Sequence, residues 1–247
     1  MFKFFESLSK PFPEGEPGRP PSGLYAFCRY YTRGFELPLI FMAVLAALVA
    51  MLEVTLFGFM GQLVDWLVTR NPETLWQEES GTLITMGVVV VFGIPTLVLL
   101  HSLLVHQTLL GNYPMAIRWS AHRYLLKQSI SFFQNDFAGR IATKVMQTSL
   151  AVRETVMKLL DVMVYIIVYF SSMLFLIGSA DKRLIIPMVF WFTAYVVIQA
   201  LLVPKLKEIS KKQADARSVM TGRVVDSYTN ISTVKLFAHT EQEADYA

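Results

Sequence analysis

The sequence predicts an all-α, polytopic membrane protein with four transmembrane helices that continue as long cytoplasmic helical extensions. Three observations lead to this fold class. Of the 247 residues, 54% are hydrophobic and only 17% are charged, whereas a soluble domain has about a quarter charged residues. The mean hydropathy is +0.46. The apolar residues are also gathered in long runs, which excludes an ordinary soluble enzyme, a disordered tail and a disulfide-rich scaffold.

Four apolar runs are long enough to cross a bilayer, because a hydrocarbon core about 30 Å thick needs about 20 helical residues. The runs occupy residues 37–60, 82–106, 159–177 and 184–204. Glu53 in the first run and Asp161 in the third are their only Asp, Glu, Lys or Arg residues. We therefore expect each run to form one transmembrane helix.

The positive charges are distributed unevenly between the loops. Of the 22 Lys and Arg residues, all but Arg70, Lys182 and Arg183 lie before the first run, between the second and third, or after the fourth. Cytoplasmic segments of membrane proteins carry the excess of Lys and Arg. We therefore expect both termini in the cytoplasm and the protein in the plasma (inner) membrane. No aromatic or groove-reading element accompanies the basic clusters, so nucleic acid is not an expected partner.

The segment before the first run is predicted to have two parts. Residues 1–21 are rich in Pro and Gly and lack a signal-peptide core, so we expect them to be disordered or extended. Residues 22–36 contain apolar side chains at helical spacing, which favours an interfacial elbow helix lying on the membrane. These side chains are Leu24, Phe27, Cys28 and Tyr31. A juxtamembrane turn anchored by aromatic residues is the alternative.

The segments on the cytoplasmic side are predicted to continue the helices. Residues 107–158 have few helix breakers after Pro114, and an amphipathic stripe with steps of three or four follows the fourth run. If the fourth helix extends from Leu184 to about Phe237, it is roughly 80 Å long, and the bilayer needs only about 30 Å of it. Pro95 and Pro114 are expected to bend the second helix.

A turn rich in phenylalanine separates two of these segments. Its turn-forming residues and its phenylalanines are Asn135, Asp136, Gly139, Phe132, Phe133 and Phe137. Exposed aromatic residues at the end of a helical stalk indicate a docking surface for another protein domain. A helix–turn–helix whose phenylalanines pack inward explains the pattern equally well.

Three stretches resemble type I ATP-binding cassette (ABC) exporters. They are Phe132-Phe133 through Gly139-Arg140-Ile141 with Thr143-Lys144-Val145, the stretch Asn230-Ile231-Ser232-Thr233-Val234-Lys235-Leu236-Phe237 continuing to Glu241 and Glu243, and residues 61–65. The first resembles the family's first intracellular loop, and the second resembles the entry into its second intracellular loop. The resemblance covers essentially residues 37–247. It is to the N-terminal portion of the transmembrane domain of a multidrug- or lipid-exporter-like half-transporter.

The resemblance implies a mechanism in which two coupling helices dock on nucleotide-binding domains and rigid helices convert ATP-driven closure into outward opening of a cavity. The first coupling helix would contain Phe132, Phe133, Gln134, Asn135, Asp136, Phe137, Ala138 and Gly139. The second would begin with Thr240, Glu241, Gln242, Glu243, Ala244, Asp245 and Tyr246.

The resemblance also implies partners. These are a nucleotide-binding domain in the same polypeptide or in a separate subunit, a second copy or a related half-transporter, membrane lipid, and a small amphipathic or lipid-like substrate. The family has six transmembrane helices before its nucleotide-binding domain, whereas these residues contain four runs and no GxxxxGK[ST] phosphate loop. We therefore expect part of a larger exporter, with ATP and Mg held in the missing nucleotide-binding domain and no catalytic residue, cofactor or metal in this chain.

Ionisable residues inside the runs are the candidates for a substrate cavity. A mid-span carboxylate costs a few kcal/mol unless it faces a wet cavity or a partner, which favours Glu53, although packing between helices is the alternative. His101 is the second candidate. His101 and His106 lie about 140° apart around a helix, so they are not expected to bind one metal ion together. Asp161 lies near the end of its run, where we expect snorkelling or a water contact to satisfy it.

A stand-alone four-helix membrane protein is the alternative function, as a channel, a scaffold or a permease subunit with a separate ATPase. A channel would need polar rings along at least one span, and the fourth run is nearly free of polar residues. Cys28 is the only cysteine, which excludes an intramolecular disulfide and a cysteine-based zinc site. No constellation typical of an enzyme converges on a common face.

Overall fold

Four helices of the computed structural model are long and apolar enough to cross a membrane. The structure describes residues 2–70, 75–134 and 138–236, and within them every regular element is helical. The four helices span Glu36–Thr69, Leu75–Leu125, Ile141–Ala180 and Lys182–Gln213. Each predicted run lies inside one of them, so the predicted all-α fold with four spans is confirmed.

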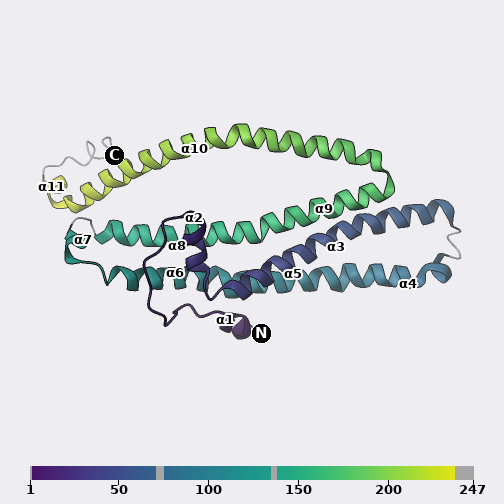
Figure 1. The fold of residues 1–247 in the computed structure, drawn as a ribbon, viewed down its shortest axis with the longest axis horizontal. Coiled ribbons are helices and arrows are strands. Elements are labelled where there is room, and N and C mark those ends of the chain that lie inside the picture. Colours follow the sequence, from purple (N-terminus) through teal and green to yellow (C-terminus); the bar gives the residue numbers. More distant parts are fainter. Residues whose placement is uncertain (1, 71–74, 135–137, 237–247) are drawn as a thin grey trace. The chain divides into compact units, whose positions relative to one another are not determined.

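The first of two compact units covers residues 1–180. Its elements from the first span onward are α3 (Glu36–Thr69), α4 (Leu75–Val88), η1 (Val89–Gly93), α5 (Ile94–Leu103), η2 (Leu104–Leu109), α6 (Leu110–Leu125), α7 (Ile130–Gln134), α8 (Ala138–Leu160) and α9 (Val162–Ala180). In Figure 1, α4 to α6 follow one another along one rod, α8 and α9 form a second, and α3 packs against α5 and α9. The predicted long extensions of the second and third helices are α6 and α8.

Two π-helical turns, η1 and η2, accompany the prolines of the α4–α6 rod. Proline has no N–H and its ring crowds the carbonyl four residues earlier, so a wider turn nearby relieves the helix. The carbonyl of Leu110 would have paired with the missing N–H of Pro114. It instead accepts a hydrogen bond from Arg153 Nη1 of α8 at 3.3 Å. The backbone defect of α6 is thereby repaired by a side chain from the neighbouring helix.

The core of the first unit lies where α3, η2, α6 and α8 meet. Met42, Leu109 and Tyr113 are wholly buried there. The Tyr113 hydroxyl lies 3.0 Å from Thr32 Oγ1, so its one polar atom is satisfied. No described residue of α9 is buried within the chain. The apolar surface of α9 is therefore available to lipid or to another polypeptide.

The N-terminal segment differs from the expectation of a disordered or extended stretch over residues 1–21. Residues Phe2–Ser7 form the short helix α1, and Phe5 and Ser9 are buried against the first unit. Burial of the Phe5 side chain in the core stabilises this segment, although the composition around it is typical of a loop. Pro and Gly dominate only the part that follows, up to residue 21.

The elbow forms helix α2 (Leu24–Thr32), whose Phe27, Cys28 and Tyr31 pack against the core. Leu24, the fourth residue of the predicted stripe, is 76% exposed. Gly34 follows the helix with a φ of 87°, a conformation that glycine adopts without strain. The chain there turns from α2 into α3.

The second unit covers residues 181–247. Asp181 begins it by accepting a hydrogen bond from the Arg183 N–H at 2.8 Å, which caps η3 (Lys182–Leu184). The long helix α10 (Ile185–Thr229) and the short α11 (Ile231–Leu236) follow. The prediction of one helix from Leu184 to about Phe237 is therefore wrong in its extent. The break falls at Asn230, a residue type that favours turns.

We predict that Met42→Ala destabilises the first unit because it leaves a cavity in the core. The expected loss of unfolding free energy is roughly 2–4 kcal/mol. It would be measured as a lower midpoint in a thermal unfolding series of the purified protein in detergent. The control is Met51→Ala on the same helix, where the side chain is 51% exposed. Equal midpoints for the two variants would contradict the assignment of the core.

Candidate functional site

A cavity of about 310 Å³ lies in the first unit between α3, α5 and the start of α9. Its walls contain Ala46, Val49, Val98, His101, Asp161, Val162 and Tyr165. All seven residues belong to the predicted runs of three different spans, which places the cavity at membrane depth. Four of them are small apolar residues, and the other three carry an imidazole, a carboxylate and a phenol.

His101 and Asp161 form a direct pair across this cavity. His101 Nε2 lies 2.9 Å from Asp161 Oδ1, and the two side chains are 24% and 26% exposed. The backbone stays helical through Asp161, whose N–H donates to the carbonyl of Met157 at 2.8 Å. The expectation that snorkelling or water satisfies Asp161 is therefore corrected, because α5 supplies a partner. In a low-dielectric interior, removing either member leaves an uncompensated polar group.

Tyr165 and Glu53 form a second pair one helical turn away. The Tyr165 hydroxyl donates a hydrogen bond to Glu53 Oε2. Asp161 and Tyr165 are four residues apart on one helical face, about 6 Å along the axis. The Tyr165 ring also stacks on Tyr169 with centroids 5.7 Å apart. Glu53 is half-buried between α3 and α9, and Tyr165 connects it to the cavity.

Glu53 and His101, the two candidates from the sequence, therefore have different partners, Tyr165 and Asp161, which lie one helical turn apart. Glu53 and His101 do not pair with each other. Each is held by a residue of the segment 161–165, which sequence reasoning did not assign to the site. A signal for one of these partners was present. His101 lies near the end of the second run and Asp161 near the beginning of the third, so both lie toward the segment that joins these two runs. Nothing in the pattern distinguished Tyr165 from the other aromatic residues of the third run.

His106 does not join this cluster. Its side chain is exposed, and its Nδ1 lies 2.9 Å from the carbonyl oxygen of Ser102 in the same helix. Among the residues that the structure describes, no three His, Cys, Asp or Glu side chains are placed to hold a metal ion. The cluster around His101 offers carboxylate, imidazole and phenol groups, which suit binding of a cation or a hydrogen-bond donor.

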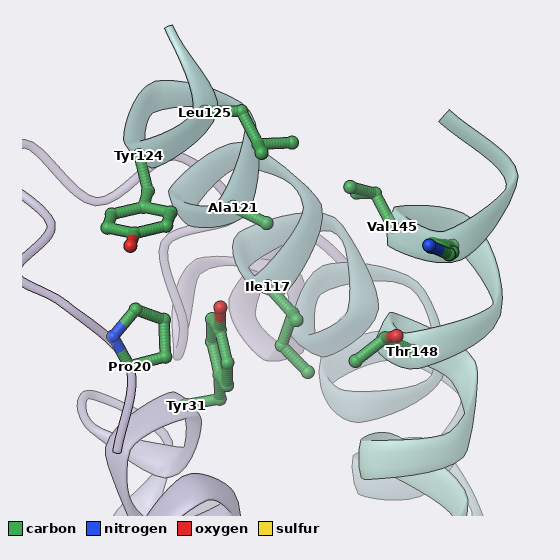
Figure 2. Close-up of a pocket in the computed structure, with 9 residues that line it drawn as sticks. Pro20, Tyr31, Ile117, Ala121, Tyr124, Leu125, Val145 and Thr148 are labelled. Carbon is green, nitrogen blue, oxygen red and sulfur yellow. The ribbon is translucent and has the colours of Figure 1, made fainter. Parts of the chain in front are cut away.

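A second, smaller cavity of about 180 Å³ lies beside α6 (Figure 2). It is lined by Pro20, Tyr31, Ile117, Ala121, Tyr124, Leu125, Lys144, Val145 and Thr148. Burial raises the pKa of Tyr31 to about 12, so its phenol stays neutral at physiological pH. Burial also raises the pKa of the neighbouring Cys28 thiol. The lining is mostly apolar, and it joins α2, α6 and α8 with the end of the N-terminal segment.

The predicted coupling segments are described only in part. Phe132 and Phe133 lie in α7, where they are 38% and 42% exposed and pack edge to face with centroids 5.3 Å apart. Gln134 ends α7, and Ala138 and Gly139 begin α8. The remaining predicted members lie outside the described residues. They are Asn135, Asp136, Phe137, Thr240, Glu241, Gln242, Glu243, Ala244, Asp245 and Tyr246.

These features define a class of protein: a polytopic helical membrane protein whose spans line a cavity with three polar side chains and extend as long helices to a turn. Residues 39–246 match the family described as ABC transporter transmembrane region. The chain belongs to this family and is a transmembrane part of an ABC transporter. The predicted resemblance to the transmembrane domain of type I ABC transporters is confirmed.

One relative supports the same assignment. An uncharacterized ABC transporter ATP-binding protein of Haemophilus influenzae is 44% identical over 248 residues, which cover 100% of this chain and 40% of the relative. The chain therefore spans less than half the length of that protein. No solved structure gives a significant match.

We predict that Tyr165→Phe destabilises the protein because it removes the hydrogen-bond donor of Glu53 inside the membrane. A buried carboxylate that loses its donor costs about 1–3 kcal/mol. Thermal unfolding in detergent would measure this loss. Tyr169→Phe is the matched control, because it makes the same chemical change one turn along the same helix. Midpoints that fall equally in both variants would contradict a specific role for the Glu53–Tyr165 bond.

Proposed function

We propose that this chain forms part of the substrate pathway of an ATP-driven exporter and transmits the movement of nucleotide-binding domains to that pathway. One observation carries the proposal, namely a cavity that three spans line with apolar walls and three polar side chains, in a chain of the ABC transporter membrane family. The relative from Haemophilus influenzae is named an ATP-binding protein, and this chain aligns with 40% of it. This supports a nucleotide-binding domain, with its ATP and Mg, elsewhere in the same polypeptide or in a separate subunit.

The chemistry of the cavity favours a small amphipathic or lipid-like substrate that carries a positive charge. Ala46, Val49, Val98 and Val162 provide apolar walls that suit a hydrocarbon group. The carboxylates of Glu53 and Asp161 stand on opposite sides of the α3–α9 interface and can offset a cationic headgroup. Intramembrane acids of this kind mark substrate pathways more often than they serve packing alone.

The helical extensions suit the proposed transmission. α6 and α8 continue beyond the apolar runs to α7, where Phe132 and Phe133 present exposed aromatic rings. Aromatic anchors of this type dominate the energetics of protein interfaces. Residues 132–139 would form the first coupling helix and residues 240–246 the beginning of the second.

The membrane surface of the spans suits a second half-transporter. Within the most apolar windows of the third and fourth spans, 0% of the described residues are buried inside the chain. Lipid covers part of such a surface, and a second copy of this chain or a related half would cover the rest. The exporter would then be a homodimer or a pair of half-transporters.

We predict that Glu53→Gln selectively impairs export of cationic substrates. In membrane vesicles that contain the transporter carrying this chain, ATP-driven uptake of a cationic dye should fall about tenfold, because a charge-assisted contact is lost. Transport of a neutral amphipath and ATP hydrolysis without substrate should be retained. The control is Glu36→Gln, the same change at the beginning of α3, outside the apolar run.

Two outcomes would count against the proposal in different ways. Unchanged transport of every cationic dye in the Glu53→Gln variant would remove Glu53 from the substrate site. Absence of ATP-driven transport in the unmodified transporter, for cationic and neutral amphipaths alike, would contradict the exporter function itself.

We predict that the N-terminus and α7 lie in the cytoplasm of a bacterial cell, because the positively charged segments lie on that side. The sole cysteine can be removed as Cys28→Ser, and single cysteines can be placed by Gln77→Cys and Ser129→Cys. A membrane-impermeant maleimide should label position 77 in intact cells and position 129 only after permeabilisation. The reverse pattern would invert the topology.

A further inference from the structure

The N-terminal segment lies along one face of the α4–α6 rod. We call residues 2–20 the strap. It comprises α1 and the irregular chain that continues to Pro20. The strap contacts Thr108, Asn112, Trp119, Arg123 and Lys127. Successive residues are four or seven positions apart, so the first four form a single stripe along η2 and α6, and Lys127 follows in the turn after α6.

The first part of the strap is anchored by buried hydrogen bonds. Thr108 Oγ1 donates to the carbonyl of Phe5 at 2.7 Å, and Ser9 Oγ donates to the carbonyl of Thr108 at 3.3 Å. Asn112 Nδ2 donates to the carbonyl of Glu6 and to Ser9 Oγ, both at 3.2 Å. Phe5, Ser9 and Thr108 are 7%, 6% and 0% exposed. Buried polar pairs of this kind are costly to break.

The second part is held by a cationic clamp. Arg123 Nη1 lies 3.3, 3.1 and 3.0 Å from the carbonyl oxygens of Pro13, Glu14 and Gly15, to which it donates. These three consecutive carbonyls have no strand or helix to pair with, and a charged donor satisfies them. Four residues farther along the chain, in the turn that follows α6, Lys127 Nζ pairs with Glu16 Oε2 at 3.0 Å.

Two further observations support this clamp. The hydrogen bond and charge of Lys127 lower the pKa of Glu16, and the charge of Arg123 acts in the same direction. Between the buried anchor and the clamp, the Phe12 ring packs edge to face on Trp119 with centroids 5.5 Å apart. The strap is therefore engaged along its whole length.

The end of the strap is hydrogen-bonded to α2. The Tyr30 hydroxyl donates to the carbonyl of Gly18 at 3.0 Å, and Pro20 faces the rings of Tyr31 and Tyr124 in the smaller cavity (Figure 2). Because α2 continues through Gly34 into α3, the strap joins α6 to the first span. α3 itself contacts the α4–α6 rod at α5 and η2, whereas the strap reaches along α6 and on to Lys127 in the turn that follows it.

We propose that the strap is a fixed tie that makes α2–α3 and α6–α8 move as one body. Movement received at α7 then reaches α3, the span that carries Glu53. The consequence for transport rests on the proposed function, but the tie itself does not. The alternative is that the strap is a releasable brake, which holds the helices back until it opens. A tie and a brake predict opposite changes in the transport rate when the strap is released or cross-linked.

Hydrogen exchange on the full-length transporter in lipid nanodiscs tests the tie without ATP. Arg123→Gln should speed exchange of the backbone amides of residues 6–8 about tenfold or more, because these amides are hydrogen-bonded in and just after α1, whose docking weakens when the rest of the strap opens. Arg70→Gln is the matched control. It removes an arginine that pairs with Glu78 and Glu79 near the other end of α3. Exchange that is equally slow in the Arg123→Gln variant would overturn the clamp.

Transport assays test the consequence. Arg123→Gln should lower transport several-fold while ATP hydrolysis continues, which is the signature of lost coupling. In a Cys28→Ser background, Glu16→Cys and Lys127→Cys can be bridged by a short bifunctional methanethiosulfonate. The bridge should leave transport unchanged and should restore it in the Arg123→Gln variant, until a reductant removes the bridge.

The opposite result would overturn the proposal. If the bridge stops transport and Arg123→Gln speeds it, the strap is a brake. If the bridge fails to rescue the Arg123→Gln variant, the loss has another cause and the tie is not what couples the helices. Failure of ATP-driven transport in the unmodified protein would count against the exporter function alone, and hydrogen exchange would still decide whether the clamp exists.

Discussion

The bilayer imposes the constraint on which this structure depends: a polar group inside it must find a partner within the protein. The backbone meets this demand by forming helices. The side chains meet it by pairing between spans, since His101 holds Asp161 and Tyr165 holds Glu53. Beyond the apolar run, the Leu110 carbonyl left over by Pro114 is satisfied by Arg153. Contacts between the first three spans are therefore specified by a few polar pairs as well as by packing.

These pairs lie beside the packed core of the first unit. Interfaces within a membrane gain little from the hydrophobic effect, because lipid is as apolar as leucine. The packed core of the first unit lies toward η2, α6 and α8, whereas α9 has no buried residue. The cavity between α3, α5 and α9 is located beside that core. A site so placed can change shape when the spans shift, while the helices that carry it stay rigid.

The strap adds a contact that neither the membrane nor the family membership requires. It lies along one face of α6 and reaches the elbow helix α2. Two helices that are distant in sequence, α6 and α2, therefore both bind the same stretch of chain. Its anchor is buried and its clamp is charged and exposed. The arrangement links the N-terminus to the helix that leads to the α7 turn, and through it to the span bearing Glu53.

The sequence by itself determined the all-α fold and the four spans, because hydropathy and length act locally and need no knowledge of neighbours, and the resemblance of three short stretches indicated the family. It also identified Glu53 and His101 as unusual, since a polar residue in an apolar run can be recognised from the sequence alone. Only the tertiary structure decided their partners. Asp161 and Tyr165 lie 60 or more residues away in the chain, and no periodicity reports which face meets which. The same reason hid the strap: a loop-like composition predicts disorder, and only the positions of Arg123 and Thr108 on a distant helix provide the partners that order it.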